Sequence, residues 1–188
     1  MRIVASSVLL LVIASPAFAD RGAGASFDFG YVRSRVAVTD NTALDGDLAR
    51  FGIKIALGRH LHIGGEAEEG SLAGTSSLPS GAVARPTDEP MGPLGGNTLG
   101  IKAYGGLHAV TGPLMFGVDA AIGIRDSWVS SDLGPDVAGY PFEPLLEMRT
   151  RADVFLTRTV TLGAISSTDM LERRNVSLAA VLSLNFTR

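Results

Sequence analysis

A two-residue alternation of apolar and polar side chains recurs along most of this chain and limits the folds that it can adopt. Residues 114–125 (LMFGVDAAIGIR) show it well, since every second residue from Leu114 to Ile124 is apolar. Successive side chains of a β-strand point to opposite faces, so this period predicts strands with one apolar face. No stretch after residue 19 has a convincing helical period, and we therefore expect an all-β fold.

Eight segments carry this pattern, and the way they are connected predicts a topology. We expect strands at residues 25–38, 48–57, 60–70, 98–109, 114–125, 146–156, 160–166 and 175–187. Tight turns at residues 58–60, 111–113 and 157–159 alternate with long connectors at residues 39–47, 71–97, 127–142 and 168–174. This order predicts an eight-stranded antiparallel up-and-down barrel, closed by pairing the first strand with the last.

The first strand contains one irregularity. Arg33 and Arg35 fall on the parity that is apolar at Phe27, Phe29 and Tyr31. Either a β-bulge or the emergence of the strand from a membrane would explain the change. The register near Arg33 stays open on the sequence alone.

Alternation does not say which face of the barrel is apolar. A secreted, lipocalin-like barrel would turn its apolar face inward around a small apolar ligand, whereas a membrane barrel would turn it toward lipid. The apolar parity stays free of charge for about ten residues per strand, the length that crosses a bilayer at a tilt. We therefore expect an eight-stranded transmembrane β-barrel, with the secreted barrel as the alternative.

The opposite parity carries balanced charges that suit a narrow lumen, where buried side chains must pair. The expected lumen charge network consists of Asp28, Arg50, Lys54, Glu66, Glu68, Lys102, Asp119, Arg125, Glu147, Arg149, Arg151 and Asp153. Aromatic residues near the strand ends predict belts at the two membrane interfaces. These are Phe27, Phe116 and Phe186 on the turn side, and Trp128, Tyr140 and Phe142 on the loop side.

The first nineteen residues have the features of a secretory signal peptide. Arg2 precedes an apolar run, and Ala17-Phe18-Ala19 before Asp20 matches a cleavage site. We expect residues 1–19 to be removed and residues 20–188 to form the barrel domain. The net charge of −3 gives no electrostatic reason to expect nucleic-acid binding.

On this topology and patterning the chain resembles the small eight-stranded outer-membrane β-barrel proteins of Gram-negative bacteria, of the OmpA membrane-domain and OmpX-like type. The resemblance implies an outer-membrane location in contact with outer-membrane lipid. It also implies recognition of the last strand by the barrel-assembly machinery. The ending Phe186-Thr187-Arg188 departs from the aromatic final residue that is common in the family.

We expect a monomer with a structural or surface-interaction role and no catalytic activity. Binding functions often lie on loops that a rigid scaffold holds, so residues 71–97 and 127–142 are the candidate sites for a surface ligand.

Residues 60–70 (HLHIGGEAEEG) are the stretch that most resembles a chemical site. The parity places His60, His62, Gly64, Glu66 and Glu68 in the lumen. His62 and Glu66 would lie about 13 Å apart along the strand, which is too far for one metal ion. A His60–His62 metal pair would need ligands from another strand. We expect Glu66 and Glu68 to pair with Lys54, Lys102 or Arg50, and we expect no metal and no cofactor.

An outer-membrane lipid-modifying enzyme is the remaining alternative. The resemblance to outer-membrane lipid A deacylases would require a membrane-facing histidine and a serine two residues later. Two positions after His60, His62 and His108 stand His62, Gly64 and Val110, so none of the three matches. No nucleophile-elbow motif occurs either. We therefore expect no catalytic residues.

Overall fold

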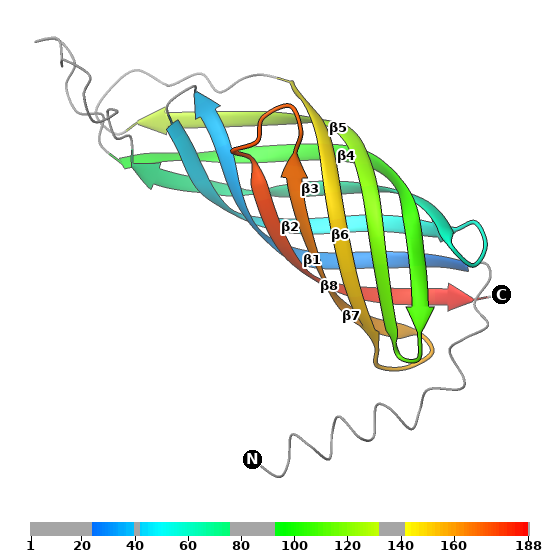
Figure 1. Cartoon of the computed structure of the whole chain (residues 1–188). Helices are drawn as coiled ribbons and strands as arrows, with labels where there is room; N and C mark the ends of the chain where they lie inside the picture. Colours follow the sequence, from blue (N-terminus) through cyan, green and yellow to red (C-terminus); the bar gives the residue numbers. More distant parts are fainter. Residues whose placement is uncertain (1–23, 40–41, 76–92, 132–141, 188) are drawn as a thin grey trace, which may run out of the picture.

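The computed structural model describes residues 24–39, 42–75, 93–131 and 142–187, which form a closed barrel of eight antiparallel strands (Figure 1). The strands are β1 (Gly24–Thr39), β2 (Thr42–Ala56), β3 (Leu61–Thr75), β4 (Pro93–Thr111), β5 (Leu114–Ser131), β6 (Glu143–Phe155), β7 (Val160–Asp169) and β8 (Val176–Thr187). The predicted fold class and topology are confirmed. The predicted signal peptide lies outside the described residues.

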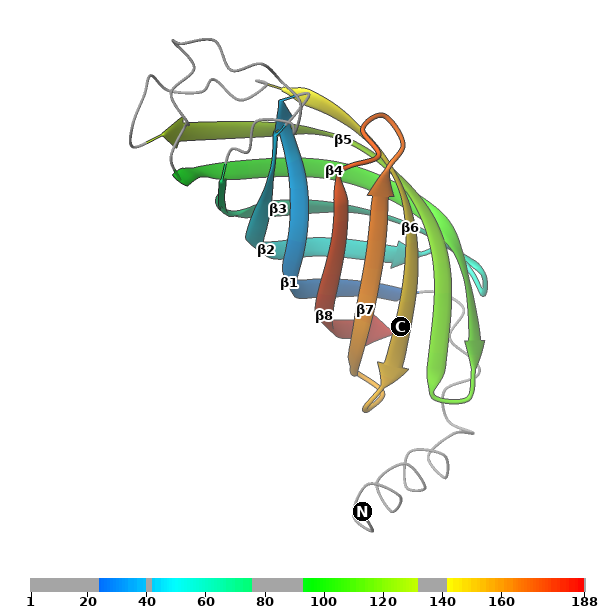
Figure 2. The ribbon, with the colours of Figure 1, turned by 60° about the vertical axis from the view of Figure 1, so that its left-hand side comes forward.

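Pairing of the first and last strands closes the sheet. The ladder between β1 and β8 runs from Gly24 opposite Thr187 to Arg35 opposite Val176. Figure 2 shows the two strands side by side, with β7 and β6 continuing the wall. Closure gives every strand two hydrogen-bonding neighbours, so no edge is left unpaired. The described residues contain no helix that is long and apolar enough to cross a membrane.

Several strands extend further toward the long connectors than the sequence predicted. β2 begins at Thr42 instead of residue 48, and β5 ends at Ser131 instead of residue 125. β3 and β4 include residues 71–75 and 93–97, which we had expected to be loop. Of the two predicted long loops, residues 76–92 and 132–141 lie outside the described residues.

At the loop end, the apolar side chains of the strands point into the barrel and the charged ones point outward, which explains these differences in strand length. Val32 and Val36 are fully buried inside the barrel, while the neighbouring Arg33 and Arg35 point outward. The alternation passes through Arg33 without interruption, and the register shift of β1 falls between Ala37 and Thr39. Strand emergence therefore accounts for the arginines, and the alternative of a bulge at Arg33 is wrong.

Apolar side chains fill the lumen at the loop end in two clusters. The outer cluster contains Val36, Leu44, Leu72, Leu94 and Val129. The inner one contains Val32, Leu48, Ile165, Ala179 and Val181. In the middle of each strand the apolar side chains point outward, whereas at the loop end they point inward. This exchange interrupts the expected pattern, and these segments were therefore predicted to be loops.

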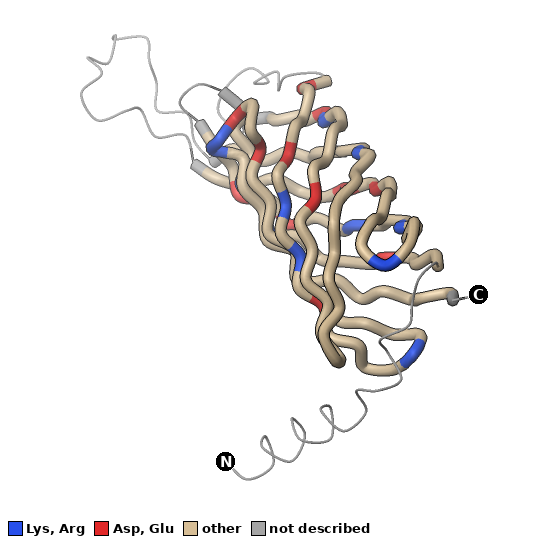
Figure 3. Tube along the Cα trace, turned by 45° about the vertical axis from the view of Figure 1, so that its right-hand side comes forward, with Lys and Arg blue, Asp and Glu red and all other residues tan. Residues whose placement is uncertain are grey.

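The middle of the barrel has the opposite polarity, with its apolar face outside. Phe51 is 56% exposed, Ile53 48%, Ile122 63% and Leu182 42%. A barrel that carries an apolar ligand would bury these side chains, so the lipocalin-like alternative is not supported. Figure 3 shows charged residues at several positions along the strands. Those in the middle of the barrel, such as Arg50, Lys102 and Arg149, are buried in its interior.

Aromatic side chains lie on the outer surface near both ends of the apolar region. The rings of Phe27 and Phe186 meet edge to face across the β1–β8 seam, with centroids 5.6 Å apart. Trp128 and Phe142 are exposed at the loop end. Tyr140, the remaining predicted belt residue on that side, lies outside the described residues.

Glycines on the inner face make room for large neighbours. Gly64 of β3 lies directly opposite Tyr104 of β4. A Cβ at Gly64 would collide with the Tyr104 ring and with the backbone oxygen of Ile53. Gly64 thus makes room for the large ring opposite it, inside a narrow barrel whose interior is filled by side chains.

Candidate functional site

The central lumen holds a network of buried ion pairs built around Glu66 of β3. Its carboxylate lies 2.6 Å from Arg50 Nη2 on β2 and 2.9 Å from Arg149 Nη2 on β6. Strands β3 and β6 are not neighbours in the sheet, so the Arg149 contact crosses the lumen. All three side chains are at least nine-tenths buried.

Lys102 of β4 joins a second acid pair to this network. Its Nζ lies 2.7 Å from Glu68 Oε2 and 2.9 Å from Glu147 Oε1. Arg50 Nη2 also approaches Glu68, at 3.0 Å, so Glu68 sits between two cations. Arg125 lies farther out, 3.9 Å from Glu147. This layer spans β2 to β6 and occupies the interior at mid-height.

A separate cluster lies nearer the turn side and is centred on Arg151 of β6. Its Nη1 donates to Asp28 Oδ2 on β1 at 2.5 Å, and its Nε donates to Asp153 Oδ2 at 2.6 Å. Arg151 Nη2 also donates to the Ser183 hydroxyl at 2.8 Å. The Asp28 contact again joins strands that are not adjacent.

Tyr104 packs beside the first cluster and was not among the residues predicted for the network. The guanidinium of Arg149 lies over its ring, 4.7 Å from the centroid. The Tyr104 hydroxyl donates to the backbone oxygen of Ile53 at 3.4 Å. Tyr104 shares its parity with Lys102, and that shared parity was the available signal for an inward position.

Lys54 and Asp119 have surroundings that the sequence did not predict. Within the described ranges, Lys54 makes no ion pair with Glu66 or Glu68, which contact Lys102 and Arg50 instead. Asp119 Oδ1 lies 2.8 Å from His62 Nε2. These two atoms are close, although they do not have the geometry of a good hydrogen bond. The other ten residues of the predicted network lie together in the two clusters described above.

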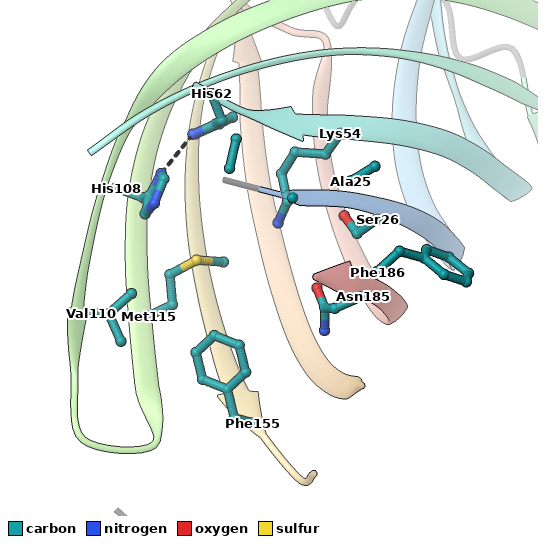
Figure 4. Close-up of a pocket in the computed structure, with 12 residues that line it drawn as sticks. Ala25, Ser26, Lys54, His62, His108, Val110, Met115, Phe155, Asn185 and Phe186 are labelled. Carbon is teal, nitrogen blue, oxygen red and sulfur yellow. Dashed lines mark hydrogen bonds between the residues drawn. The ribbon is translucent and has the colours of Figure 1, made fainter. Parts of the chain in front are cut away.

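A small cavity opens at the turn-side end of the lumen, below the Arg151 cluster. Figure 4 shows Lys54, His62, His108 and Met115 turned toward it. Its volume is about 70 Å³, and Phe155 and Val110 provide apolar wall. The Nδ1 atoms of His62 and His108 lie 3.1 Å apart. His60 is exposed and does not line the cavity, so its predicted position in the lumen is wrong. Its Nδ1 lies 3.2 Å from the backbone oxygen of His108.

Two kinds of side-chain packing therefore fill the lumen. Ion pairs that cross the lumen fill its middle, and the two apolar clusters fill its loop end. None of the three histidines forms a hydrogen bond with a serine or threonine hydroxyl in the described part of the chain. Within the same residues there is no group of three or more His, Cys, Asp or Glu side chains that could hold a metal ion.

A closed eight-stranded barrel with an apolar wall and a charged lumen defines a class of fold, that of the small outer-membrane barrels. No protein-family model matches the sequence, and no curated protein matches it either. Among solved structures, the chain is similar to Ail, the attachment invasion locus protein of Yersinia pestis, in complex with the heparin analogue sucrose octasulfate. The TM-score is 0.55 at 12% identity, over 88% of this chain and 99% of Ail.

A second similar structure is Neisserial surface protein A. It matches with a TM-score of 0.55 and 14% identity, over 88% of this chain and 97% of that protein. At this level of identity the likeness concerns the fold. It confirms the architecture that the sequence resemblance implied.

Proposed function

We propose that this chain is a non-catalytic integral β-barrel protein of the bacterial outer membrane. The observation that supports the proposal is the outward belt of large apolar side chains, of which Phe51 and Ile122 are examples. Soluble monomers rarely expose contiguous apolar patches larger than a few hundred Å². Lipid removes the cost of this exposure, and the closed sheet leaves no backbone group unpaired in lipid.

Fractionation of cells that express the chain tests the location. We expect recovery in the outer-membrane fraction, extraction only by detergent, and a band whose gel mobility changes on boiling. The same preparation from cells without the gene serves as the control. Recovery in the soluble fraction without detergent would contradict the membrane location.

The non-catalytic role is supported by the described histidines, none of which forms a hydrogen bond with a serine or threonine hydroxyl in the described part of the chain. An enzyme that modifies outer-membrane lipid would change the mass spectrum of lipid A. We expect identical lipid A profiles from strains with and without the gene. A mass change that depends on the gene would overturn this part of the proposal.

The filled lumen supports a structural or surface-contact role over a transport role. Arg149 and Glu66 meet across the middle, and Val36 and Leu44 belong to the apolar cluster that fills the loop end. We expect no large, stable single-channel current in planar bilayers. A reproducible large conductance would show that the interior opens.

We further propose that the segments 71–97 and 127–142 make contact with a surface partner. Ail is described in complex with a heparin analogue. The two segments 71–97 and 127–142 of this chain hold one base, Arg85, and four acids, which are Asp88, Glu89, Asp132 and Asp136. This charge disfavours a sulfated ligand, so we do not extend that ligand class to this protein.

Deletion of residues 76–92 tests the surface role. Cells that display the wild-type barrel should bind immobilised matrix or serum proteins better than cells that display the deletion variant. Sucrose octasulfate should not compete. Equal binding by both cell types, with equal display of folded barrel, would contradict a role for this segment.

Assembly and oligomeric state complete the proposal. The alternating pattern of β8 supports recognition by the barrel-assembly machinery. In a monomer, lipid would contact the apolar belt on all sides of the barrel, which supports a single chain. Depletion of the assembly machinery should reduce the folded form, and light scattering in detergent should give the mass of one chain. A stable dimer mass would contradict the monomer.

A further inference from the structure

The turn-side cavity carries an arrangement of ligands that the proposed function does not use. We propose that His62 and His108 form a binding site for a single copper ion, with Met115 beside them as a third ligand. The proposal is independent of the membrane role, because it concerns the interior of the barrel and can be tested on the purified protein.

The distance between the two imidazoles suits a shared ion. His62 Nδ1 and His108 Nδ1 are 3.1 Å apart, and their rings are tilted by 44°. A metal ion about 2.0–2.1 Å from each nitrogen would see them at an angle of about 100°. That angle lies between the square-planar and tetrahedral values, and small ring rotations would aim both lone pairs at the ion.

The surroundings hold His62 in the form that a metal ligand needs. Its Nε2 lies 2.8 Å from Asp119 Oδ1, and a carboxylate beside Nε2 favours a proton on that nitrogen, although the pair lacks good hydrogen-bond geometry. His62 Nδ1 then accepts the hydrogen bond from His108 Nδ1, and a bound ion would take the place of the proton between these two nitrogens. Asp119 itself fits because the opposite residue is Gly106, where a Cβ would collide with the Asp119 carboxylate and backbone. Tyr104 packs edge-on against the His62 ring, with centroids 6.2 Å apart.

Met115 decides which metal the site favours. Its side chain lines the same cavity as the two histidines, and Figure 4 shows its sulfur on the side of His108. A thioether beside two imidazoles favours copper over hard ions such as Mg²⁺ or Ca²⁺. Among divalent first-row ions, Cu²⁺ also binds nitrogen sites most tightly. Water from the turn-side opening would complete the coordination.

Lys54 is the feature of the cavity that opposes a cation. Its ammonium group lines the same space, and within the described residues it makes no ion pair. Removing this charge should strengthen copper binding, whereas removing either histidine should weaken it. Lys54→Met keeps most of the side-chain volume and is the suitable variant.

The test is a titration of the detergent-folded, metal-free protein without a histidine tag, using Cu²⁺ in glycine buffer to remove weakly held copper. We expect one Cu²⁺ per chain, with an electron paramagnetic resonance spectrum that shows nitrogen hyperfine coupling from two imidazoles. His62→Ala and His108→Ala should each weaken binding at least tenfold. Asp119→Asn should weaken it by about 10–100-fold, and Lys54→Met should tighten it.

His60→Ala is the matched control, because His60 precedes the same strand but does not line the cavity. It should bind copper as the wild type does. Folding of each variant is checked by its heat-modifiable gel mobility. Absence of binding in glycine buffer would overturn the proposal. Equal copper affinity in wild type, His62→Ala and His108→Ala would do so too, as would a loss of affinity confined to His60→Ala.

The third ligand is tested separately with Cu⁺. Met115→Leu should weaken binding of Cu⁺, measured by competition with a Cu⁺ chelator. Unchanged Cu⁺ affinity would remove Met115 from the site.

Discussion

Arg149 Nη2 donates to Glu66 Oε2 at 2.9 Å, which joins β6 to β3 across the barrel between residues 83 positions apart. Glu66 also accepts from Arg50 at 2.6 Å, so one carboxylate pairs with two guanidinium groups. Buried charges are tolerated only when they are paired in this way. The contact therefore fills the middle of the lumen and joins opposite walls of the sheet.

Glu66→Gln should destabilise the barrel strongly. It leaves Arg149 without the acid that it pairs with, while Arg50 keeps only Glu68, and breaking a buried pair costs about 3–5 kcal/mol. Urea unfolding in lipid or detergent, followed by gel mobility, measures the change. Asp45→Asn is the control, because the Arg33–Asp45 pair is exposed at 3.8 Å and should contribute about 0–1 kcal/mol. Equal effects of the two substitutions would show that burial does not strengthen the Glu66 pairs.

Ile122→Arg tests the lipid-facing belt. Ile122 is exposed in the middle of β5, and an arginine at the bilayer midplane costs about 2–4 kcal/mol. Asn97→Arg, on the outer face at the loop end of β4, should cost about 0–1 kcal/mol because it lies near the interface. The folded fraction in liposomes of each variant gives the comparison. A smaller effect at Ile122 than at Asn97 would contradict the proposed position of the bilayer.

Leu44→Ala tests the apolar filling at the loop end. Leu44 is fully buried against Leu72 and Val36, although the sequence placed it in a loop. Truncating a buried leucine costs about 2–5 kcal/mol. Leu171→Ala is the control, because Leu171 is exposed in the connector before β8 and should change stability by less than about 0.5 kcal/mol. A Leu44 variant as stable as the control would mean that this cluster does not contribute.

Gly64→Ala should disturb the packing inside the barrel. The added methyl would meet the Tyr104 ring and the Ile53 carbonyl oxygen, and the backbone oxygen cannot move away without shifting the sheet. Overpacking of this kind costs about 1–3 kcal/mol. Gly95→Ala is the matched control, since a Cβ there meets nothing within 4 Å. Similar melting temperatures for wild type and Gly95→Ala, with a lower one for Gly64→Ala, would agree with this prediction, whereas a Gly64→Ala variant that melts with the wild type would refute it.

The connector between β7 and β8 should show an acid-resistant ion pair. Glu172 accepts hydrogen bonds from the side chain and backbone of Arg174, and these lower the pKa of Glu172 to about 2. A lowered pKa stabilises the folded connector above the unfolded pKa of about 4.3, and this contribution is lost as the pH falls toward 2. NMR titration of the Glu172 side chain measures the pKa. Arg174→Ala should return it toward the usual value; an unchanged pKa in that variant would assign the shift to another cause.

Local alternation was enough to predict most of the strands and their facing. Phe51 and Ile53 point outward, and Glu66 and Glu68 point inward, as their parity indicated. This works because successive side chains of any strand alternate between two faces, whatever the strand pairs with. The strict order of tight and long connectors then indicated an antiparallel barrel closed between its first and last strands.

The ends of the strands were less predictable. Arg33 and Val32 keep the same alternation as the residues before them, but the environment on each side of the wall changes at this height. Alternation of apolar and polar residues shows that a strand has two different faces. It does not show at which height the apolar face changes from the outer surface to the lumen. For the same reason the sequence placed Leu44 and Leu72 in loops.

The amino-acid sequence by itself determined the all-β fold, the antiparallel order and the parity of the inward charges. Only the tertiary structure decided which charges meet. Glu66 pairs with Arg149 across the lumen, while Lys54, which lies on the strand next to it, turns to the cavity beside His62 and His108. These contacts depend on the stagger between strands and on the width of the closed barrel. Both are properties of all eight strands together, and no single segment encodes them.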